Sequence, residues 1–295
     1  MIGRALIFAG ALMAATSGAA SPGQGAKPAP AAAPAPTPYV KNPLYWPTPI
    51  MDRVPPRLPR LRRGAVLILS KTNGFRDSEQ IRAATAALEK LVKGEGRDVF
   101  VTENAAVMNR RDLGRFSAVI LNSTSGTIFD AGQRAAFRRW IERGGGVVML
   151  HGAGGDHDYD WRWYVETLLG AQFIGHTSKP DQFQPGTIHV IDRDHPATRD
   201  LPAEWSRVEE WYAFDHAPHG QGTRILATLD EGSYAPGPGQ RMGRIHPVVW
   251  TRCVGRGRIF FSALGHKAET YAEPLHLKLI DGAIRWAMRA EGAGC

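Results

Sequence analysis

The sequence predicts an open, doubly wound α/β sheet, and three observations point to it. Short apolar runs alternate with amphipathic segments over roughly 90 residues that follow Gly64. The runs are apolar throughout, as expected of parallel strands that helices cover on both faces. Glycines stand at the ends of the amphipathic segments, where helices commonly stop. Strands and helices that alternate in this way form a mostly parallel sheet.

The first half of the predicted domain alternates strictly between strand and helix. The run Ala65–Leu69 contains no polar residue, so it fits a buried parallel strand. A helix follows at 79–93, because apolar residues recur there at helical spacing and Gly94 then ends the pattern. The other elements of this half are strands at 99–101, 118–121 and 147–150 and a helix at 130–143.

The pattern changes after His151. Residues 152–222 are rich in aromatic residues, His, Asp and Gly, and they contain few long apolar runs. We therefore predict a long excursion after the fourth strand that carries functional residues. The sheet resumes with strands at 225–229, 248–254 and 259–261 and a closing helix at 273–288. Together these elements predict one domain at 64–290.

The residues before this domain predict export. Arg4, an apolar run at 5–15 and small residues before Ser21 form the pattern of a secretory signal peptide at 1–20. A membrane anchor is the weaker alternative, because about 11 apolar residues fall short of the roughly 20 that span a bilayer. We expect a periplasmic or extracellular protein with no integral membrane span after signal cleavage. Residues 21–63 are rich in Pro and Ala, which predicts an extended basic linker.

Most of the net charge of +8 belongs to this N-terminal region. Residues 64–295 hold 28 basic and 27 acidic residues. A nucleic-acid-binding face on the domain therefore has no support from composition. The two cysteines, Cys253 and Cys295, indicate neither a disulfide scaffold nor a Cys-x-x-Cys zinc site.

Two histidines follow predicted strands at the edge of the sheet where ligands bind in this fold class. His151 ends the fourth strand and enters a Gly-rich turn, and His266 follows the last strand. The turn at His151 offers no Ser or Cys, which argues against acyl-enzyme chemistry there. An imidazole at this position can still act as a base or a metal ligand. A histidine that is hydrogen-bonded at a strand end for structure alone is the alternative.

Glu210 is the acid that we nominate to complete a catalytic set with His151 and His266. Neutral imidazoles and one carboxylate form a usual ligand set for zinc, manganese or iron. No His-Glu-x-x-His motif is present, so a divalent metal is expected only from residues distant in sequence. The histidines predicted as its ligands are His151, His176, His246 and His266.

Acidic and aromatic residues near these histidines favour a sugar ligand. The segment 156–161 concentrates both kinds, and sugars present apolar faces to aromatic rings and hydroxyls to carboxylates. Packing of these aromatic rings against the sheet is the alternative. The residues predicted to bind substrate are Arg76, Asp77, Asn122, Thr124, Asp156, Asp160, Trp161, Tyr212 and Tyr271.

Several segments together resemble the ThuA-like family, named for a trehalose-utilisation protein. They are Lys-Thr-Asn-Gly-Phe-Arg at 71–76, Gly-Gly-Gly-Val-Val-Met-Leu-His at 144–151, Tyr-Asp-Trp at 159–161, 192–198, Glu-Trp-Tyr at 210–212, His-Pro at 246–247, Gly-His at 265–266 and Tyr-Ala-Glu-Pro at 271–274. The resemblance extends over 65–288 and implies a flavodoxin-like sheet similar to that of class I glutamine amidotransferases. It implies no glutaminase, since the amidotransferase cysteine is absent from the turn at His151. Family members usually carry His directly after Phe-Arg, where this chain has Asp77.

Two functions from different classes follow from these residues. The first is an exported lyase, isomerase or hydrolase that acts on a disaccharide, glycoside or keto-sugar through histidines and a possible divalent metal. The alternative is a non-catalytic sugar-binding module tethered at the cell surface. An amidase or peptidase is disfavoured, because Cys253 lies within a predicted strand. The expected partner is a small carbohydrate, and the sequence does not determine the oligomeric state.

Overall fold

The structure, a computed structural model, describes residues 41–292 and 295. The predicted signal peptide at 1–20 and the first part of the predicted linker at 21–63, namely residues 21–40, lie outside the described residues. In the described chain the strands are β1 (Ala65–Leu69), β2 (Val99–Thr102), β3 (Phe116–Asn122), β4 (Gly146–Leu150), β5 (Phe173–His176), β6 (Gln184–Val190), β7 (Glu204–Glu209), β8 (Tyr212–Phe214), β9 (Arg224–Leu229), β10 (Pro247–Val254) and β11 (Gly257–Ser262). The α-helices of the same residues are α1 (Ser78–Gly94), α2 (Arg110–Leu113), α3 (Ala131–Glu142) and α4 (Pro274–Ala287).

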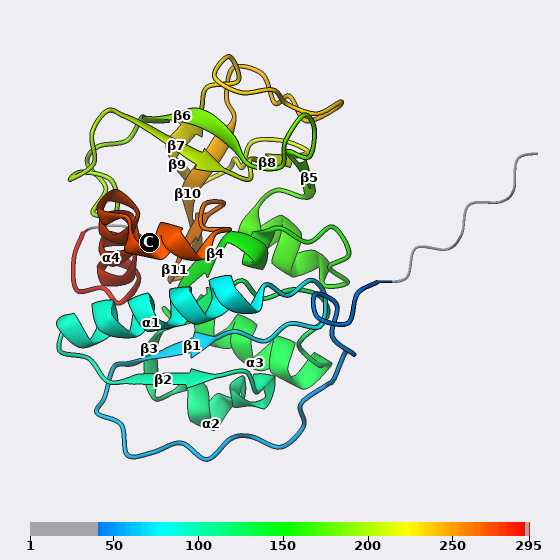
Figure 1. The fold of residues 1–295 in the computed structure, drawn as a ribbon. Helices are drawn as coiled ribbons and strands as arrows, with labels where there is room; N and C mark the ends of the chain where they lie inside the picture. Colours follow the sequence, from blue (N-terminus) through cyan, green and yellow to red (C-terminus); the bar gives the residue numbers. More distant parts are fainter. Residues whose placement is uncertain (1–40, 293–294) are drawn as a thin grey trace, which may run out of the picture. The chain divides into compact units, whose positions relative to one another are not determined.

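The parallel half of the sheet agrees with the sequence prediction. Its strands lie side by side in the order β2-β1-β3-β4-β11 and all run parallel. Every residue of β1, β4 and β11 is buried. In Figure 1, α1 and α4 lie in front of these strands and α3 lies behind them. Helices on both faces explain the continuous apolar runs and confirm the doubly wound arrangement.

Polar side chains fix where the helices begin. The Asp77 carboxylate caps α1, because it accepts hydrogen bonds from the backbone N–H groups of Glu79 and Gln80 at 2.9 and 3.0 Å. Asp130 and Gln133 form a reciprocal capping box at the start of α3. α4 begins with Pro274, which needs no hydrogen-bond partner at the first helical position.

The long excursion after β4 is confirmed, and it continues the sheet in antiparallel fashion. β10, β9, β6 and β7 extend the sheet beyond β11 in that order. β5 and β8 form a separate two-stranded ribbon. The sequence analysis missed β6 and β7, because alternate residues of these strands are exposed or only partly buried and no continuous apolar run marks them.

Residues 41–63, hereafter the N-terminal strap, lie against the domain although the sequence analysis assigned them to a linker. The Asp52 carboxylate forms an ion pair with Lys71 at 3.0 Å and accepts a hydrogen bond from the backbone N–H of Ala105 at 2.9 Å. Leu58 and Leu61 pack against the hydrophobic core. The extended, Pro-rich strap thus uses side-chain and backbone contacts that its composition does not indicate.

Cys253 on β10 forms a disulfide with Cys295. The bond ties the C-terminal residue of the chain to the antiparallel half of the sheet. The sequence analysis did not predict this pairing, because the two residues are 42 positions apart and no spacing motif links them.

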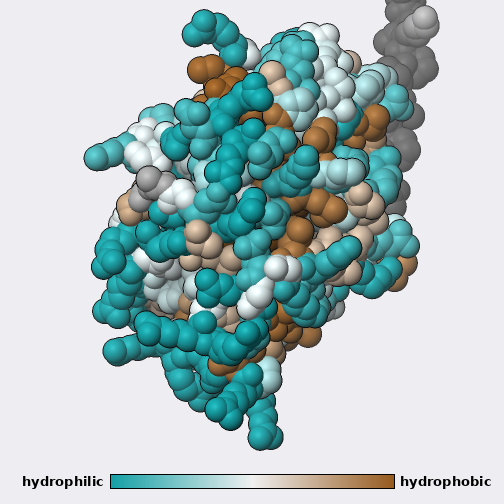
Figure 2. All heavy atoms as spheres, turned by 90° about the vertical axis from the view of Figure 1, so that its left-hand side faces the viewer, coloured by the Kyte–Doolittle hydropathy of each residue, from teal (hydrophilic) through white to brown (hydrophobic). Residues whose placement is uncertain are grey.

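Two observations concern contact with a membrane: the length and apolar character of the described helices, and the hydropathy of one face of the molecule. None of these helices combines the length and the apolar character that a bilayer crossing requires. The face shown in Figure 2 is largely hydrophilic, and its apolar residues form small groups between polar ones. That face carries no broad apolar patch of the kind that marks a large interaction surface.

Candidate functional site

The site is built on the sharp turn that follows β4. His151 has φ 46° and Ser123, which follows β3, has φ 48°. Residues other than glycine rarely adopt this left-handed conformation, and such positions gather at functional sites. The His151 Nδ1 atom lies 2.9 Å from the carbonyl oxygen of Ala263, so the ring donates there and directs Nε2 the other way. The turn therefore fixes both the position and the orientation of this imidazole.

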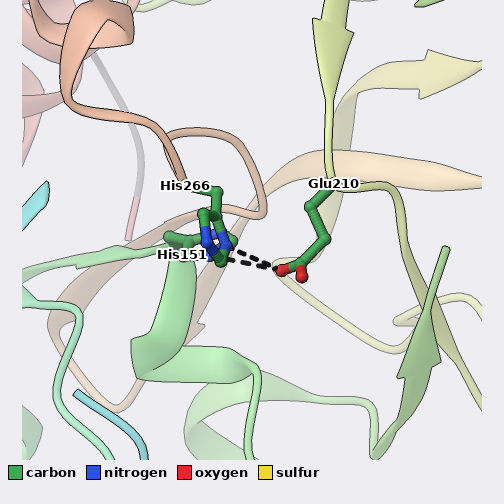
Figure 3. Close-up of side chains that lie close together, drawn as sticks. All are labelled: His151, Glu210 and His266. Carbon is green, nitrogen blue, oxygen red and sulfur yellow. Dashed lines mark hydrogen bonds and ion pairs between the residues drawn. The ribbon is translucent and has the colours of Figure 1, made fainter. Parts of the chain in front are cut away.

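His151, Glu210 and His266 come together in three dimensions from distant parts of the chain (Figure 3). His266 Nδ1 lies 3.0 Å from His151 Nε2 and 2.9 Å from Glu210 Oε2. His151 Nε2 lies 3.6 Å from the same carboxylate oxygen. We call these three side chains the His–Glu–His cluster. All three are largely buried, so their mutual interactions act in a medium that screens charge poorly.

Burial and charge set the protonation states of the cluster. Burial, followed by the neighbouring His266, lowers the pKa of His151 to about 4, which keeps this ring neutral at pH 7. Burial alone would raise the pKa of Glu210, but the hydrogen bond and positive charges of the histidines lower it to about 2. Burial of His266 by itself would lower the pKa of its ring. The hydrogen bond and negative charge of Glu210 have the larger effect, so the pKa of His266 is raised.

Several more side chains touch the cluster, among them Tyr212, His176 and Gln182, whose amide donates to Glu210 Oε1 at 2.6 Å. The Tyr212 hydroxyl lies 2.9 Å from His151 Nε2, and burial with the nearby Glu210 and Glu209 charges raises the pKa of this phenol well above its usual value. It therefore stays protonated and can donate a hydrogen bond. His176 Nδ1 lies 3.1 Å from Glu210 Oε1 and 2.8 Å from the carbonyl oxygen of Thr177. Its Nε2 atom is thus left to accept a proton.

The cluster lies at the wall of a cavity of about 260 Å³. The wall combines acids, histidines and aromatic rings, a combination that suits a small polar ligand with apolar faces. Its lining residues are Trp46, Phe75, Asp77, Gln80, Ser123, Ser125, His151, Gly152, Gly155, Asp156, His157, Asp158, Phe173, His176, Gln182, Glu210, Tyr212 and His266.

The cluster fits a divalent metal ion. Two imidazole nitrogens and one carboxylate oxygen lie within 4.8 Å of one another. Ligands at about 2.1 Å from one ion lie roughly 3.0–3.4 Å apart, close to the 2.9, 3.0 and 3.6 Å separations found here. The bond from His151 Nδ1 to Ala263 is the outer contact that metal-binding imidazoles commonly make. His151, Glu210 and His266 could therefore hold zinc, manganese or iron.

Glu209 holds the backbone of the cluster in place. Its fully buried carboxylate accepts hydrogen bonds from the N–H groups of Gly265 at 2.9 Å, His266 at 3.3 Å and Glu210 at 3.1 Å. Arg207 forms an ion pair with it at 3.0 Å. Burial nevertheless raises the pKa of Glu209, because these contacts only partly offset the loss of solvent. One side chain thus positions two members of the cluster.

The structure brings seven of the predicted site residues to the cavity. In addition to the cluster these are Asp77, Asp156, His176 and Tyr212. Asp77 Oδ2 lies 3.9 Å from His266 Nε2 while the carboxylate also caps α1. Asp156 accepts hydrogen bonds from the backbone N–H groups of Gly126 and Asp158. Each of these acids therefore shapes the wall of the cavity as well as facing it.

Four of the predicted substrate-binding residues lie near the cavity but serve the fold. Arg76 pairs with Glu103 at 2.7 Å. The buried Asn122 amide donates to Ser70 and Thr85, and the Tyr271 hydroxyl accepts from Gln80. The fourth, Thr124, is buried and is not a lining residue. These side chains support the residues at the strand ends.

Three further predictions do not match the positions in the structure. Asp160 pairs with Arg134, and Trp161 packs edge-on against Phe129, so neither lines the cavity. His246 is fully buried, between Glu231 at 2.9 Å and the carbonyl oxygen of Tyr212 at 2.7 Å. It is not a member of the cluster that could hold a metal ion. The structure therefore places His246 apart from the other predicted ligands His151 and His266.

The sequence analysis missed several contributors to the site, among them Glu209 and Trp46. Glu209 could have been found, because Trp205, Arg207 and Glu209 share the buried face of β7 and two charges on such a face indicate an ion pair. Trp46 lies in the strap, where the Pro-rich composition gave no sign of a fixed position. Only the three-dimensional contacts of the strap reveal it.

Comparison with known proteins gives a family match and a set of related folds. A family model described as ThuA, trehalose utilisation, matches residues 65–287. A ThuA-like protein from Bacteroides uniformis superimposes with a TM-score of 0.65 at 24% identity, covering 80% of this chain and 95% of that one. A ThuA-like protein from Parabacteroides merdae gives 0.57 at 19% identity, over 79% and 93% of the two chains. A cytoplasmic protein from Salmonella typhimurium gives 0.53 at 10% identity, over 76% and 99%.

These structural matches support the fold alone. They agree with the predicted flavodoxin-like, class I glutamine amidotransferase-like sheet. No protein with a curated description matches the sequence.

We expect Glu209→Gln to lower the free energy of unfolding by about 2–4 kcal/mol, because a neutral amide would remove the buried charge partner of Arg207 and leave it only the more exposed Glu273. Urea unfolding measures the change. Glu204→Gln is the matched control, since Glu204 lies on the same strand with a side chain that is 71% exposed. Equal unfolding free energies for the two variants would contradict the positioning role of Glu209.

Proposed function

The chain belongs to the ThuA family, described by trehalose utilisation, and from this membership and the His–Glu–His cluster we propose that it is an enzyme acting on a carbohydrate. The observation that carries the proposal is the buried cluster at the wall of a cavity lined by acids and aromatic rings. Carboxylates accept hydrogen bonds from sugar hydroxyls, and rings pack on apolar sugar faces. The substrate class is a disaccharide, a glycoside or a keto-sugar derivative.

The cluster is the metal-binding part of this enzyme in our proposal. At neutral pH His151 is neutral and Glu210 is ionised, which are the states that bind a cation. The Nδ1 atom of His266 must release the proton that it shares with Glu210, and the Tyr212 hydroxyl must turn away from His151 Nε2, before a cation can bind in their place. A divalent ion there supplies Lewis-acid polarisation of a sugar carbonyl or hydroxyl oxygen.

The other side chains bind the sugar and move its protons. His176 Nε2 is the base, because Nδ1 is occupied by Thr177 and Glu210 and the ring reaches the cavity. The Tyr212 hydroxyl donates a hydrogen bond to a sugar oxygen. Asp77 and Asp156 accept hydrogen bonds from sugar hydroxyls at the wall of the cavity. Removal of a proton next to a carbonyl leads to elimination or isomerisation, and attack by water leads to hydrolysis.

Asp77 stands where the resemblance leads us to expect a histidine. Its carboxylate lies 3.9 Å from His266 Nε2 and caps α1. The acid therefore keeps a polar contact with the cluster and adds negative charge at the cavity. We propose that Asp77 replaces the expected histidine as a hydrogen-bond acceptor, so the chemistry at the cluster is retained.

We expect His266→Gln to lower sugar turnover at least about 100-fold, because the variant removes one member of the cluster. Purified protein is incubated with trehalose, sucrose and their 3-keto derivatives, and products are followed by chromatography. His157→Gln is the matched control, since His157 lines the same cavity with a side chain that is 70% exposed and has no bond to the cluster.

The possible outcomes of this test separate the two function classes. Turnover by the wild type and by His157→Gln, but not by His266→Gln, supports the enzyme. Full turnover by His266→Gln would overturn the role of the cluster. Saturable sugar binding by the wild type without any product would replace the enzyme with a non-catalytic binding module.

We also propose that the chain is exported to the periplasm or the extracellular space. The residues at 1–20 have the pattern of a signal peptide, although they lie outside the described structure. The Cys253–Cys295 disulfide adds support, because such bonds persist mainly in oxidising compartments.

The exported protein is expected to begin at Ser21 and to carry no reactive thiol. Mass spectrometry of protein isolated from the periplasm or medium, alkylated without reductant, measures both properties. Alkylation after unfolding and reduction is the control and should label both cysteines. Protein found only in the cytoplasm, with Met1 retained and two reactive thiols, would contradict export.

A further inference from the structure

Among the residues that the structure describes, one wall residue of the cavity lies outside the family match. Trp46 lines the cavity together with Phe75, Asp77 and the cluster. It belongs to the strap, which precedes the residues 65–287 matched by the ThuA model. The family membership therefore assigns no role to Trp46, and its place in the cavity needs its own explanation.

Hydrogen bonds fix the strap on both sides of Trp46. The carbonyl oxygen of Tyr45 accepts a bond from the backbone N–H of Arg76 at 2.8 Å. The Asn73 side chain bonds to both backbone groups of Ile50, at 3.0 and 3.2 Å, and to the carbonyl oxygen of Thr127 at 2.6 Å. In Figure 1 the strap, drawn in blue, runs around the β2 edge of the sheet to the region where α1 begins. Trp46 is thus held at a defined place.

Aromatic rings connect Trp46 to the cluster. The Trp46 and Phe75 rings meet edge to face with centroids 5.8 Å apart, and Phe75 lies 6.3 Å from the His266 ring. Phe75 keeps 40% of its surface exposed even though Tyr45 also stacks on it. The Lys41 ammonium lies 3.9 Å above the Trp46 ring. A series of aromatic rings, exposed at Phe75 and partly buried at Trp46, therefore continues outward from the cluster.

We propose that Trp46 and Phe75 form a second sugar subsite, which binds the ring attached to the sugar at the cluster. The inference rests on the proposed carbohydrate function of the same site. A single sugar at the cluster reaches Phe75, whereas a ring linked to it extends over Phe75 to Trp46. Apolar sugar faces gain contact with such rings, and the strap holds the rings before the ligand arrives. The strap thus gives the site a preference for disaccharides over monosaccharides.

The alternative is that Trp46 only fills space beside Phe75, and this role predicts a different effect of substitutions on sugar binding. A side chain that only covers Phe75 could be replaced by any large apolar residue without changing which sugar binds. A subsite needs a flat ring, so Phe should replace Trp46 and Leu should not. The comparison of Trp46→Phe with Trp46→Leu separates these two roles, because both variants keep an apolar side chain on the strap.

The experiment measures binding of trehalose, maltose and D-glucose to the full chain by titration calorimetry. We expect Trp46→Leu to weaken disaccharide binding roughly five- to tenfold and to leave glucose binding unchanged. Trp46→Phe should change disaccharide binding less than about twofold. Leu44→Ala is the control on the strap, because Leu44 is 77% exposed and does not line the cavity.

Each result has a distinct meaning. Disaccharide binding that is equal in the wild type and Trp46→Leu overturns the subsite and leaves the proposed function intact. An equal loss for glucose and disaccharides in Trp46→Leu also overturns it, since the residue then shapes the whole cavity. Absence of binding of every sugar to the wild type overturns the carbohydrate function itself, and the subsite with it.

Discussion

The buried carboxylate of Glu209 connects the antiparallel half of the sheet to the parallel half, and the candidate site depends on this contact. β7 lies at the far edge of the sheet from the parallel strands, yet its last residue accepts hydrogen bonds from Gly265 and His266 after β11. Arg207 supplies the charge that makes burial of this acid tolerable. The contact brings Glu210 to the two histidines. Without it, one acid and two imidazoles would belong to separate parts of the fold.

The parallel half of the sheet could be predicted from the sequence because its chemistry is local. Helices cover both faces of β1, β3 and β4, so each of these strands contains a continuous apolar run. The rule that ligands bind at the carboxyl ends of such strands then located His151 and His266. The disulfide and the contacts of the strap could not be predicted in this way, since no local pattern encodes either.

In the excursion after β4, local sequence patterns do not distinguish residues that reach the cavity from residues that are buried in the core. Glu210 and His246 are both acid–base side chains near strand ends, and nothing local to either states which reaches the cavity. Glu210 faces the histidines because hydrogen bonds fix both of its neighbours in the chain. Glu209 accepts from the backbone N–H of Gly265. Trp211 donates to Thr177 and to the carbonyl oxygen of Gln184. His246 instead meets Glu231 and packs into the core. Whether a side chain of the excursion faces the cavity depends on how the antiparallel strands pack against the rest of the sheet, and that packing is set by residues distant in sequence.

Two arrangements would satisfy the polar atoms of the cluster. In the first, a proton on His266 bonds to Glu210; in the second, a bound cation would take the place of that proton and be held by all three side chains. The second arrangement is the one that we propose, because the His151 ring directs Nε2 toward the ligand atoms of His266 and Glu210. The strap contributes Trp46 to the wall of the same cavity from outside the family-matched residues.

The central claim is that His151, Glu210 and His266 bind one divalent ion. The most direct measurement is elemental analysis by mass spectrometry of the full chain, purified without chelator and incubated in turn with zinc, manganese and iron. We expect close to one ion per wild-type chain and per His157→Gln chain, with loss of the ion in Glu210→Gln. No bound ion in the wild type under any condition, or full retention in Glu210→Gln, would contradict it.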